Sequence, residues 1–179
     1  MKTNDSVSQQ LPEYLDALWR FAWRLSQNHD AAQELTQGTC LRALEYESAY
    51  RGGNLKSWLF KIMHNLWRDE VRHHIRAGLK VVSPGEADMI ADRVENPEHQ
   101  VLLREVQQMI NRLPEAQRTV LLLTAVEGLS YRETAELLDV PLGTVMSRLA
   151  RAREKMGQSV QQQNEPSVSV QSQEWSCKR

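Results

Sequence analysis

Apolar residues recur along most of the chain at intervals of three or four, the spacing that lines one face of an α-helix. The first such run begins near Leu11, with Pro12 in its first turn, and stops around Asn28. No segment alternates apolar and polar residues as a half-buried strand does. The pattern therefore predicts an all-α protein.

Two further helices are predicted before the middle of the chain. Asp30 is a residue type that caps helices, so it is expected to open a second helix that continues to about Glu47. Two adjacent glycines, Gly52 and Gly53, then interrupt the pattern. Periodicity resumes over residues 55–76, which predicts a third helix.

Between residues 77 and 97 the periodicity fails, and Gly, Ser, Pro and acidic residues accumulate, as in a flexible linker. Helices are predicted again from Pro97 to Pro114 and over residues 115–127. Two small helical domains joined by a flexible linker are thus expected. The predicted boundaries are a disordered tail over 1–10, a domain over 11–78, a linker over 79–97, a domain over 98–157 and a disordered tail over 158–179.

Residues 130–156 have the pattern of a helix-turn-helix. Ser130 and Glu133 form a capping-box pattern that opens a short helix, and Pro141 and Gly143 mark a turn before a second, amphipathic helix. Such a helix can enter the major groove of DNA. An ordinary helical hairpin with a solvated basic face would share this pattern. The candidate DNA-reading residues, which lie opposite the apolar arc, are Thr144, Met146, Ser147, Arg148, Ala150 and Arg151.

The predicted third helix interleaves aromatic and basic residues. Lys61, Asn65, Arg68, Arg72 and Arg76 fall along one side of it, as a helix of 3.6 residues per turn requires. A basic track can follow a phosphate backbone, and neighbouring aromatic rings can stack on unpaired bases. The same spacing also occurs on solvated helix faces that bind nothing, with tryptophans that belong to the core.

Charge is distributed unevenly, although the formal net charge is −1. Residues 11–50 carry three basic and six acidic side chains, whereas residues 51–80 carry seven basic and two acidic ones. A second basic cluster lies near residue 150. This segregation suggests two contacts with a polyanion, and acidic surface that remains for protein partners.

Composition excludes several other classes of protein. The longest apolar run, 120–126, is too short to cross a bilayer, so no membrane insertion and a cytoplasmic location are expected. Two cysteines imply no disulfide framework. No phosphate-binding glycine loop or paired-cysteine metal site is present. Three histidines near Asp69, which are His64, His73 and His74, are only weak evidence for a metal site. We therefore expect no enzyme activity, no cofactor and no metal.

The C-terminal motif resembles the promoter-reading domain of extracytoplasmic-function (ECF) sigma factors of the sigma-70 family. The residues that carry the resemblance are Glu127-Gly128-Leu129-Ser130-Tyr131, Glu136-Leu137-Leu138, Val140-Pro141, Gly143-Thr144-Val145, Ser147-Arg148-Leu149 and Arg151-Ala152-Arg153-Glu154. Arg51-Gly52, Trp58-Leu59, Ile62 and Asn65 match the promoter-melting segment of the same family. Many relatives have a basic residue where this chain has Met146.

The resemblance implies a sigma factor that directs RNA polymerase to promoters by binding and melting DNA. The C-terminal helix would read the −35 duplex. Single-stranded −10 DNA would be bound by Lys56, Lys61, Asn65, Arg68 and Arg72, with Asn65 holding a flipped base. Residues 30–37 resemble the segment that docks on core polymerase, which implies Glu34, Gln37 and Arg42 as contacts. The expected partners are core RNA polymerase, promoter DNA and an anti-sigma factor.

Two alternatives use the same motifs differently. A sigma-like mimic could sequester an anti-sigma factor without touching polymerase, but the intact basic stripe and Asn65 argue against it. A simple regulator could use the helix-turn-helix alone, which would leave the N-terminal match unexplained.

Overall fold

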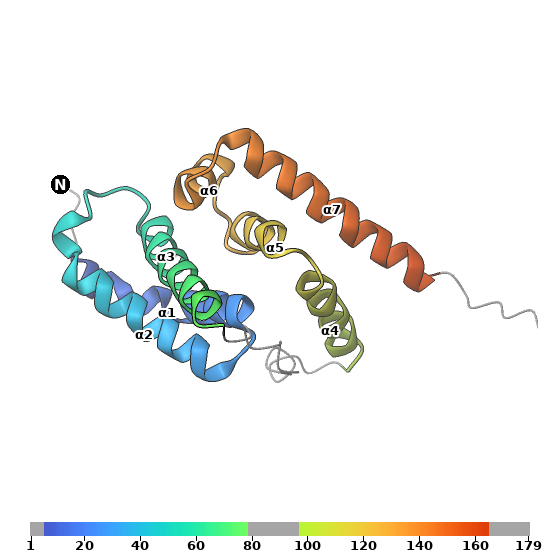
Figure 1. Ribbon diagram of the computed structural model, residues 1–179, viewed down its shortest axis with the longest axis horizontal. Helices are drawn as coiled ribbons and strands as arrows, with labels where there is room; N and C mark the ends of the chain where they lie inside the picture. The colour runs from blue at the N-terminus through green and yellow to red at the C-terminus, as the bar shows by residue number, and fades with distance from the viewer. Residues whose placement is uncertain (1–5, 79–96, 165–179) are drawn as a thin grey trace, which may run out of the picture.

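The computed structural model describes residues 6–78 and 97–164, with side chains over 6–78 and 100–158 (Figure 1). Every regular element in these ranges is helical, which confirms the all-α prediction. The greater part of the predicted linker lies outside the described residues. None of the described helices combines the length and apolar character needed to span a membrane.

The N-terminal bundle consists of three α-helices. They are α1 (Val7–Ser26), α2 (His29–Glu45) and α3 (Leu55–Arg76), and a short 3-10 turn, η1 (Glu47–Ala49), follows α2. Helix α3 has the predicted bounds. The interior is formed by aromatic and aliphatic side chains, and the rings of Phe21 and Phe60 meet edge to face with centroids 4.9 Å apart.

The predicted start of the first helix is wrong by four residues. Ser6 and Gln9 form a complete capping box, so α1 begins at Val7 and the predicted disordered tail does not include residues 6–10. Val7 is only 2% exposed, and its N–H donates to the carboxylate of Glu47 at 2.7 Å. Pro12 consequently lies inside the helix and not in its first turn.

Helix α2 is capped by a different residue from the one predicted. The side chain of Asn28, not Asp30, accepts the hydrogen bond from the Ala31 N–H, at 2.9 Å. Asp30 instead lies in the first turn, where its negative charge suits the positive end of the helix dipole. The helix ends at Glu45, two residues before the predicted end.

The C-terminal bundle consists of four α-helices and one π-helical turn. They are α4 (Pro97–Asn111), α5 (Glu115–Leu121), the π-helical segment η3 (Leu122–Val126), α6 (Tyr131–Leu138) and α7 (Leu142–Asn164). Gly128, with φ of +72°, ends the predicted helix over 115–127 where the sequence places the stop. Helix α4 already begins at Pro97, so the linker predicted over 79–97 extends one residue too far.

The helix-turn-helix differs from its prediction in two details. The turn is shorter, because Asp139 adopts a left-handed conformation with φ of 55° and α7 begins at Leu142. Gly143 therefore lies in the helix. Helix α7 also continues to Asn164, so the tail predicted over 158–179 is wrong for residues 158–164.

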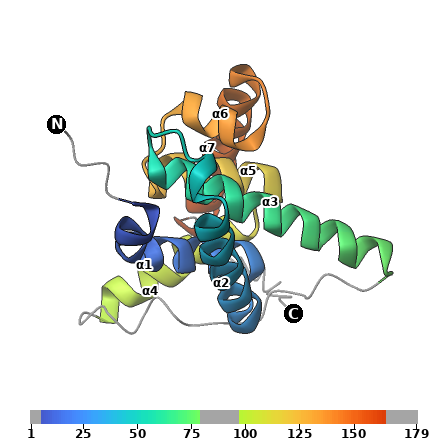
Figure 2. The same cartoon turned by 90° about the vertical axis from the view of Figure 1, so that its left-hand side faces the viewer.

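The two bundles pack against each other through α3. Helix α3 runs between α1 and α2 on one side and α6 on the other, as the two views show (Figures 1 and 2). Apart from Met109, the buried apolar side chains of both bundles belong to one continuous cluster, which extends from Leu18 and Phe60 to Val120 and Leu149. Helix α3 therefore packs against helices of both bundles.

Candidate nucleic-acid and polymerase interfaces

The predicted DNA-reading face of α7 is exposed. Val145, Leu149 and Ala152 are at most 2% exposed and fix the helix on the C-terminal bundle. Met146, on the other side, is 48% exposed. Of the remaining candidates, Ser147, Ala150 and Arg151 are exposed, whereas Thr144 and Arg148 are half-buried at the edge of the same face. The structure brings all six together on one side of α7.

Local capping fixes how α7 is presented. Ser130 caps α6 and receives the Glu133 N–H, while the Glu133 carboxylate accepts the Ser130 N–H at 2.8 Å. These hydrogen bonds, together with one from Asn54, hold the pKa of Glu133 below its usual value. The helix that precedes the recognition helix therefore begins at a defined residue.

The basic stripe of α3 is exposed over its central and C-terminal turns. Lys61, Arg68 and Arg72 are exposed, and Asn65 is half-buried between them. Arg72 forms an ion pair with Asp69 at 3.7 Å, in which both side chains are more than half exposed. Exposed ion pairs contribute little to the stability of the folded protein. Arg72 can therefore leave Asp69 and bind a phosphate at a small cost in free energy.

Lys56 does not lie in the exposed part of this stripe. Its Nζ is 3.1 Å from the carboxylate of Glu127 and donates to the Glu127 carbonyl oxygen at 2.7 Å. Lys56 therefore lies at the contact between the two bundles, separated from the four predicted DNA-binding residues further along α3. Sequence reasoning gave no sign of this, because Glu127 lies 71 residues away.

The tryptophans of α3 are structural. Trp67 is 9% exposed, and its indole N–H donates to the Glu115 carboxylate of α5 at 2.9 Å. Trp58 is half-buried against the ring of Tyr50, with centroids 5.3 Å apart. Neither ring is presented on the exposed stripe, so the interpretation that they belong to the core is the better one.

The predicted polymerase contacts lie on the outer surface of α2. Glu34, Gln37 and Arg42 are all exposed. Leu41, which the sequence analysis did not single out, is 60% exposed beside them, and Leu44 is 45% exposed. The two leucines therefore add uncovered apolar surface to the polar face that carries the three predicted contacts. Sequence could not separate them from core leucines, because the periodicity of α2 is weak.

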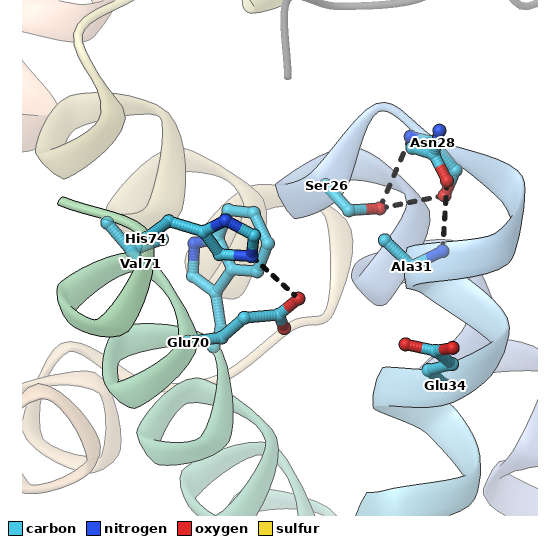
Figure 3. A pocket seen from close by; sticks show the side chains of 8 residues that line it. Ser26, Asn28, Ala31, Glu34, Glu70, Val71 and His74 are labelled. Carbon is cyan, nitrogen blue, oxygen red and sulfur yellow. Dashed lines mark hydrogen bonds and ion pairs between the residues drawn. The ribbon is translucent and has the colours of Figure 1, made fainter. Parts of the chain in front are cut away.

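A pocket of about 250 Å³ opens between the α1–α2 turn and the C-terminal half of α3 (Figure 3). Ala31, Trp67 and Val71 are its apolar lining residues, and Glu34 of α2 and Glu70 of α3 line it from opposite sides. His74 Nε2 lies 3.8 Å from the Glu70 carboxylate. The eight lining residues are Ser26, Asn28, Ala31, Glu34, Trp67, Glu70, Val71 and His74.

The described residues include no clear metal-binding site and no reactive thiol. Among residues 6–78 and 97–164, no three His, Cys, Asp or Glu side chains are grouped to hold a metal ion. Burial raises the pKa of the Cys40 thiol, so little of it is the reactive thiolate at neutral pH. Cys177 lies outside the described residues.

Comparison with known proteins matches both bundles to one class. Residues 12–77 match the family description "Sigma-70 region 2", and residues 103–156 match "Sigma-70, region 4". The two regions define a sigma factor of the sigma-70 class. Named relatives narrow the class, and the chain belongs to the family of ECF RNA polymerase sigma factors, which direct RNA polymerase to promoters.

Three relatives illustrate the similarity. ECF sigma factor SigE of Mycolicibacterium smegmatis is 35% identical over 80% of this chain, which spans 57% of that relative. ECF sigma factor EcfG of Rhodopseudomonas palustris is 33% identical over 87% of this chain and 86% of its own length. Among solved structures, sigma factor RpoE of Bartonella quintana, bound to the anti-sigma factor NepR, is 29% identical and aligns with a TM-score of 0.73 over 86% of this chain and 96% of its own.

Proposed function

We propose that this sigma factor contacts promoter DNA through two separate helix faces. Lys61, Asn65, Arg68 and Arg72 of α3 bind the single strand exposed at the −10 element, and α7 reads the −35 duplex. The observation that supports this proposal is burial: both helices are fixed by apolar contacts and leave these polar faces exposed.

Asn65 is proposed to hold an extruded base. Its amide offers both a donor and an acceptor, which matches the Watson–Crick edge of an unpaired base. The cations one turn to either side would hold the flanking phosphates. Base extrusion costs a few kcal/mol, and these contacts compensate for it without nucleotide hydrolysis. The protein therefore acts by binding and not as an enzyme.

The start of α7 supplies the duplex contacts. Thr144 and Ser147 carry hydroxyls for base edges or phosphates, while Arg148 and Arg151 neutralise phosphates. Met146, exposed among them, offers an apolar contact of the kind that a thymine methyl group accepts. This role replaces the basic contact that many relatives of the family have at this position.

Core polymerase is proposed to dock on α2 through Glu34, Gln37 and Arg42, with Leu41 as the apolar centre of the contact. An anti-sigma factor is proposed as a second protein partner, because the Bartonella quintana relative is bound to one in its structure. We further propose functional units over 11–78 and 98–157, joined by a linker, in a cytoplasmic protein.

Run-off transcription with purified core polymerase on genomic promoter fragments tests the proposal. The folded chain should form open complexes and co-purify with core polymerase. Leu41→Ala should weaken that co-purification, whereas Leu15→Ala, which removes an exposed leucine from α1, should not. A chain that binds an anti-sigma factor but never core polymerase would instead be a mimic.

A further inference from the structure

A short loop precedes α3, and two glycines set its shape. Gly52 and Gly53 have φ angles of +85° and +101°, which residues with a side chain rarely adopt. A Cβ atom at either position would meet nothing within 4 Å beyond its chain neighbours, so packing does not require the glycines. Arg51 and both glycines are exposed. The glycines therefore serve a particular backbone conformation that faces open space.

Both ends of this loop are anchored on α3. Tyr50 stands at the start of the loop, and its half-buried ring packs on Trp58 of α3 with centroids 5.3 Å apart. Asn54 stands at the end of the loop and caps α3 by accepting the Ser57 N–H at 3.2 Å. The exposed residues 51–53 thus lie between two fixed points.

One side-chain hydrogen bond crosses the loop. The Tyr50 hydroxyl donates to the carbonyl oxygen of Gly53 at 2.8 Å. Desolvation, and then the neighbouring Tyr14 of α1, raise the pKa of the Tyr50 phenol, so the hydroxyl keeps the proton that it donates. A neutral hydrogen bond changes a conformational equilibrium by about two- to tenfold. This is enough to favour one conformation of a short loop and too little to decide whether the protein folds.

The backbone of the loop offers hydrogen-bond donors to a ligand. Within residues 6–78 and 100–158, the N–H groups of Arg51, Gly52 and Gly53 have no hydrogen-bond acceptor. Main-chain N–H groups bind phosphate oxygens of nucleic acids, and glycine lets the backbone approach a ligand closely. The Arg51 guanidinium adds a positive charge at the same place. The loop therefore suits a phosphate group.

Helical spacing places this loop in line with Asn65. Trp58, Ile62 and Asn65 are separated by four and then three residues, so they follow one face of α3, and all three are half-buried. Asn65 lies about 10 Å along the helix axis from Trp58, on which the Tyr50 ring packs. A strand that follows this face from Asn65 towards the start of α3 therefore meets the loop.

We propose that Tyr50 is a positioning residue for strand capture. Its hydroxyl holds the Gly53 carbonyl, and this keeps the N–H groups of residues 51–53 directed at a phosphate of the nucleotide whose base Asn65 holds. The inference rests on the proposed function and deepens it, because it names a further contact for the same strand and the residue that orients this contact.

Tyr50→Phe removes the hydroxyl and leaves the ring on Trp58. With purified core polymerase and a genomic promoter fragment, the full-length variant should form about fivefold fewer open complexes, measured by permanganate reactivity of unpaired thymines. Its unfolding temperature should change by less than about 4 °C, and its binding to the −35 duplex should equal that of wild type. Tyr46→Phe is the matched control, because Tyr46 is 56% exposed in the same bundle, and it should open the promoter normally.

A double-mutant cycle with Asn65→Ala distinguishes positioning from a general structural role. If the loop and Asn65 act on the same nucleotide, Tyr50→Phe should reduce opening less than about twofold once Asn65→Ala has removed its contact, because the effects of coupled residues do not add. A general structural role would give the same fivefold loss in both backgrounds.

Gly52→Ala changes the loop without changing the hydroxyl. Alanine is strained at a φ of +85°, so this variant should lose at least as much opening as Tyr50→Phe. Gly157→Ala is the matched control, because Gly157 lies in α7 with open space around it, and it should open the promoter as wild type does. A Gly52→Ala variant with wild-type opening would overturn the proposed loop contact.

Three results with Tyr50→Phe would also overturn the proposal: wild-type opening, a larger loss of thermal stability, or equal losses in both Asn65 backgrounds. Failure of the proposed function gives a different result. If wild type opens the promoter and Asn65→Ala reduces opening while Tyr50→Phe does not, only the role of Tyr50 is refuted. If wild type neither binds core polymerase nor opens a promoter, the proposed function itself fails.

Discussion

Helices α3 and α7 both carry a basic face, but they are buried to different extents. Helix α3 is enclosed by α1 and α2 on one side and by α6 on the other, and its first turn meets two carboxylates. Helix α7 packs through one narrow face, and its opposite side is open. The same kind of sequence pattern thus yields one surface that is partly occupied and one that is free. Charge pattern alone does not decide whether a basic helix is accessible.

The largest predicted effect tests how deeply α3 is embedded. Phe60→Ala removes a ring that is 0% exposed and packed edge to face on Phe21, so the free energy of unfolding should fall by about 3–5 kcal/mol. Met146→Ala on α7 should change it by less than about 0.5 kcal/mol, because that side chain is exposed. Urea denaturation followed by circular dichroism measures both. If both variants lost the same free energy of unfolding, the proposed effect of burial would be contradicted.

A second prediction separates the roles of the two helices. Asn65→Ala should reduce open-complex formation at least about tenfold, the loss expected for a hydrogen bond to an extruded base. Binding of the duplex −35 element should stay at the wild-type level, because α7 is unchanged. Permanganate reactivity of unpaired thymines reports opening, and an electrophoretic mobility shift reports duplex binding. Equal loss of both would count against separate roles.

A third, smaller effect concerns phosphate contacts of α7. Arg151→Ala should weaken duplex binding about fivefold and reduce the slope of log affinity against log salt by about 1, since one counterion fewer is released. Arg112→Ala removes an exposed arginine of the same bundle outside α7 and should leave the slope unchanged. Fluorescence anisotropy over a salt series measures both variants. A slope that both variants lower equally would indicate non-specific attraction.

The smallest effect is a pH dependence that arises at the packed side of α3. Burial, and then the charge of Arg68, lower the pKa of His64 in the folded protein, with Glu115 opposing them. As the pH falls, His64 therefore becomes protonated in the unfolded chain at a higher pH than in the folded protein. Stability should be complete above the ordinary histidine pKa of about 6.5 and should fall as the pH decreases below it. His64→Gln should flatten this part of a thermal-unfolding profile, and an unchanged profile would contradict the assignment.

Short-range patterns in the sequence predict most of the helices. Two capping patterns that fix where helices begin are also present in the sequence, although the predicted starts did not use them. Ser6 and Gln9 form a capping box, a sequence pattern that predicts the start of α1 at Val7. Asn28 is likewise a residue type that caps helices, and it caps α2. The extension of α7 to Asn164 was not available in this way. Its last turns are polar and rich in glutamine, which local propensity leaves undecided.

Periodicity also anticipated which side of each candidate helix would face solvent. The stripe at Lys61, Arg68 and Arg72 and the outer face of α7 are both exposed. The roles of these residues towards DNA remain predictions. By contrast, the environment of Lys56 depends on Glu127, and no helical spacing relates residues so far apart in the chain.

The sequence by itself determined the helices, their caps and the polar face of each, because these depend on residues within about four positions of one another. Tertiary structure decided that Glu127 is buried between Arg24 and Lys56, that Leu41 is exposed and that the start of α3 is occupied. These properties depend on which surfaces meet when the bundles pack. Burial and ion pairing between distant segments are therefore decided only once the whole chain has folded.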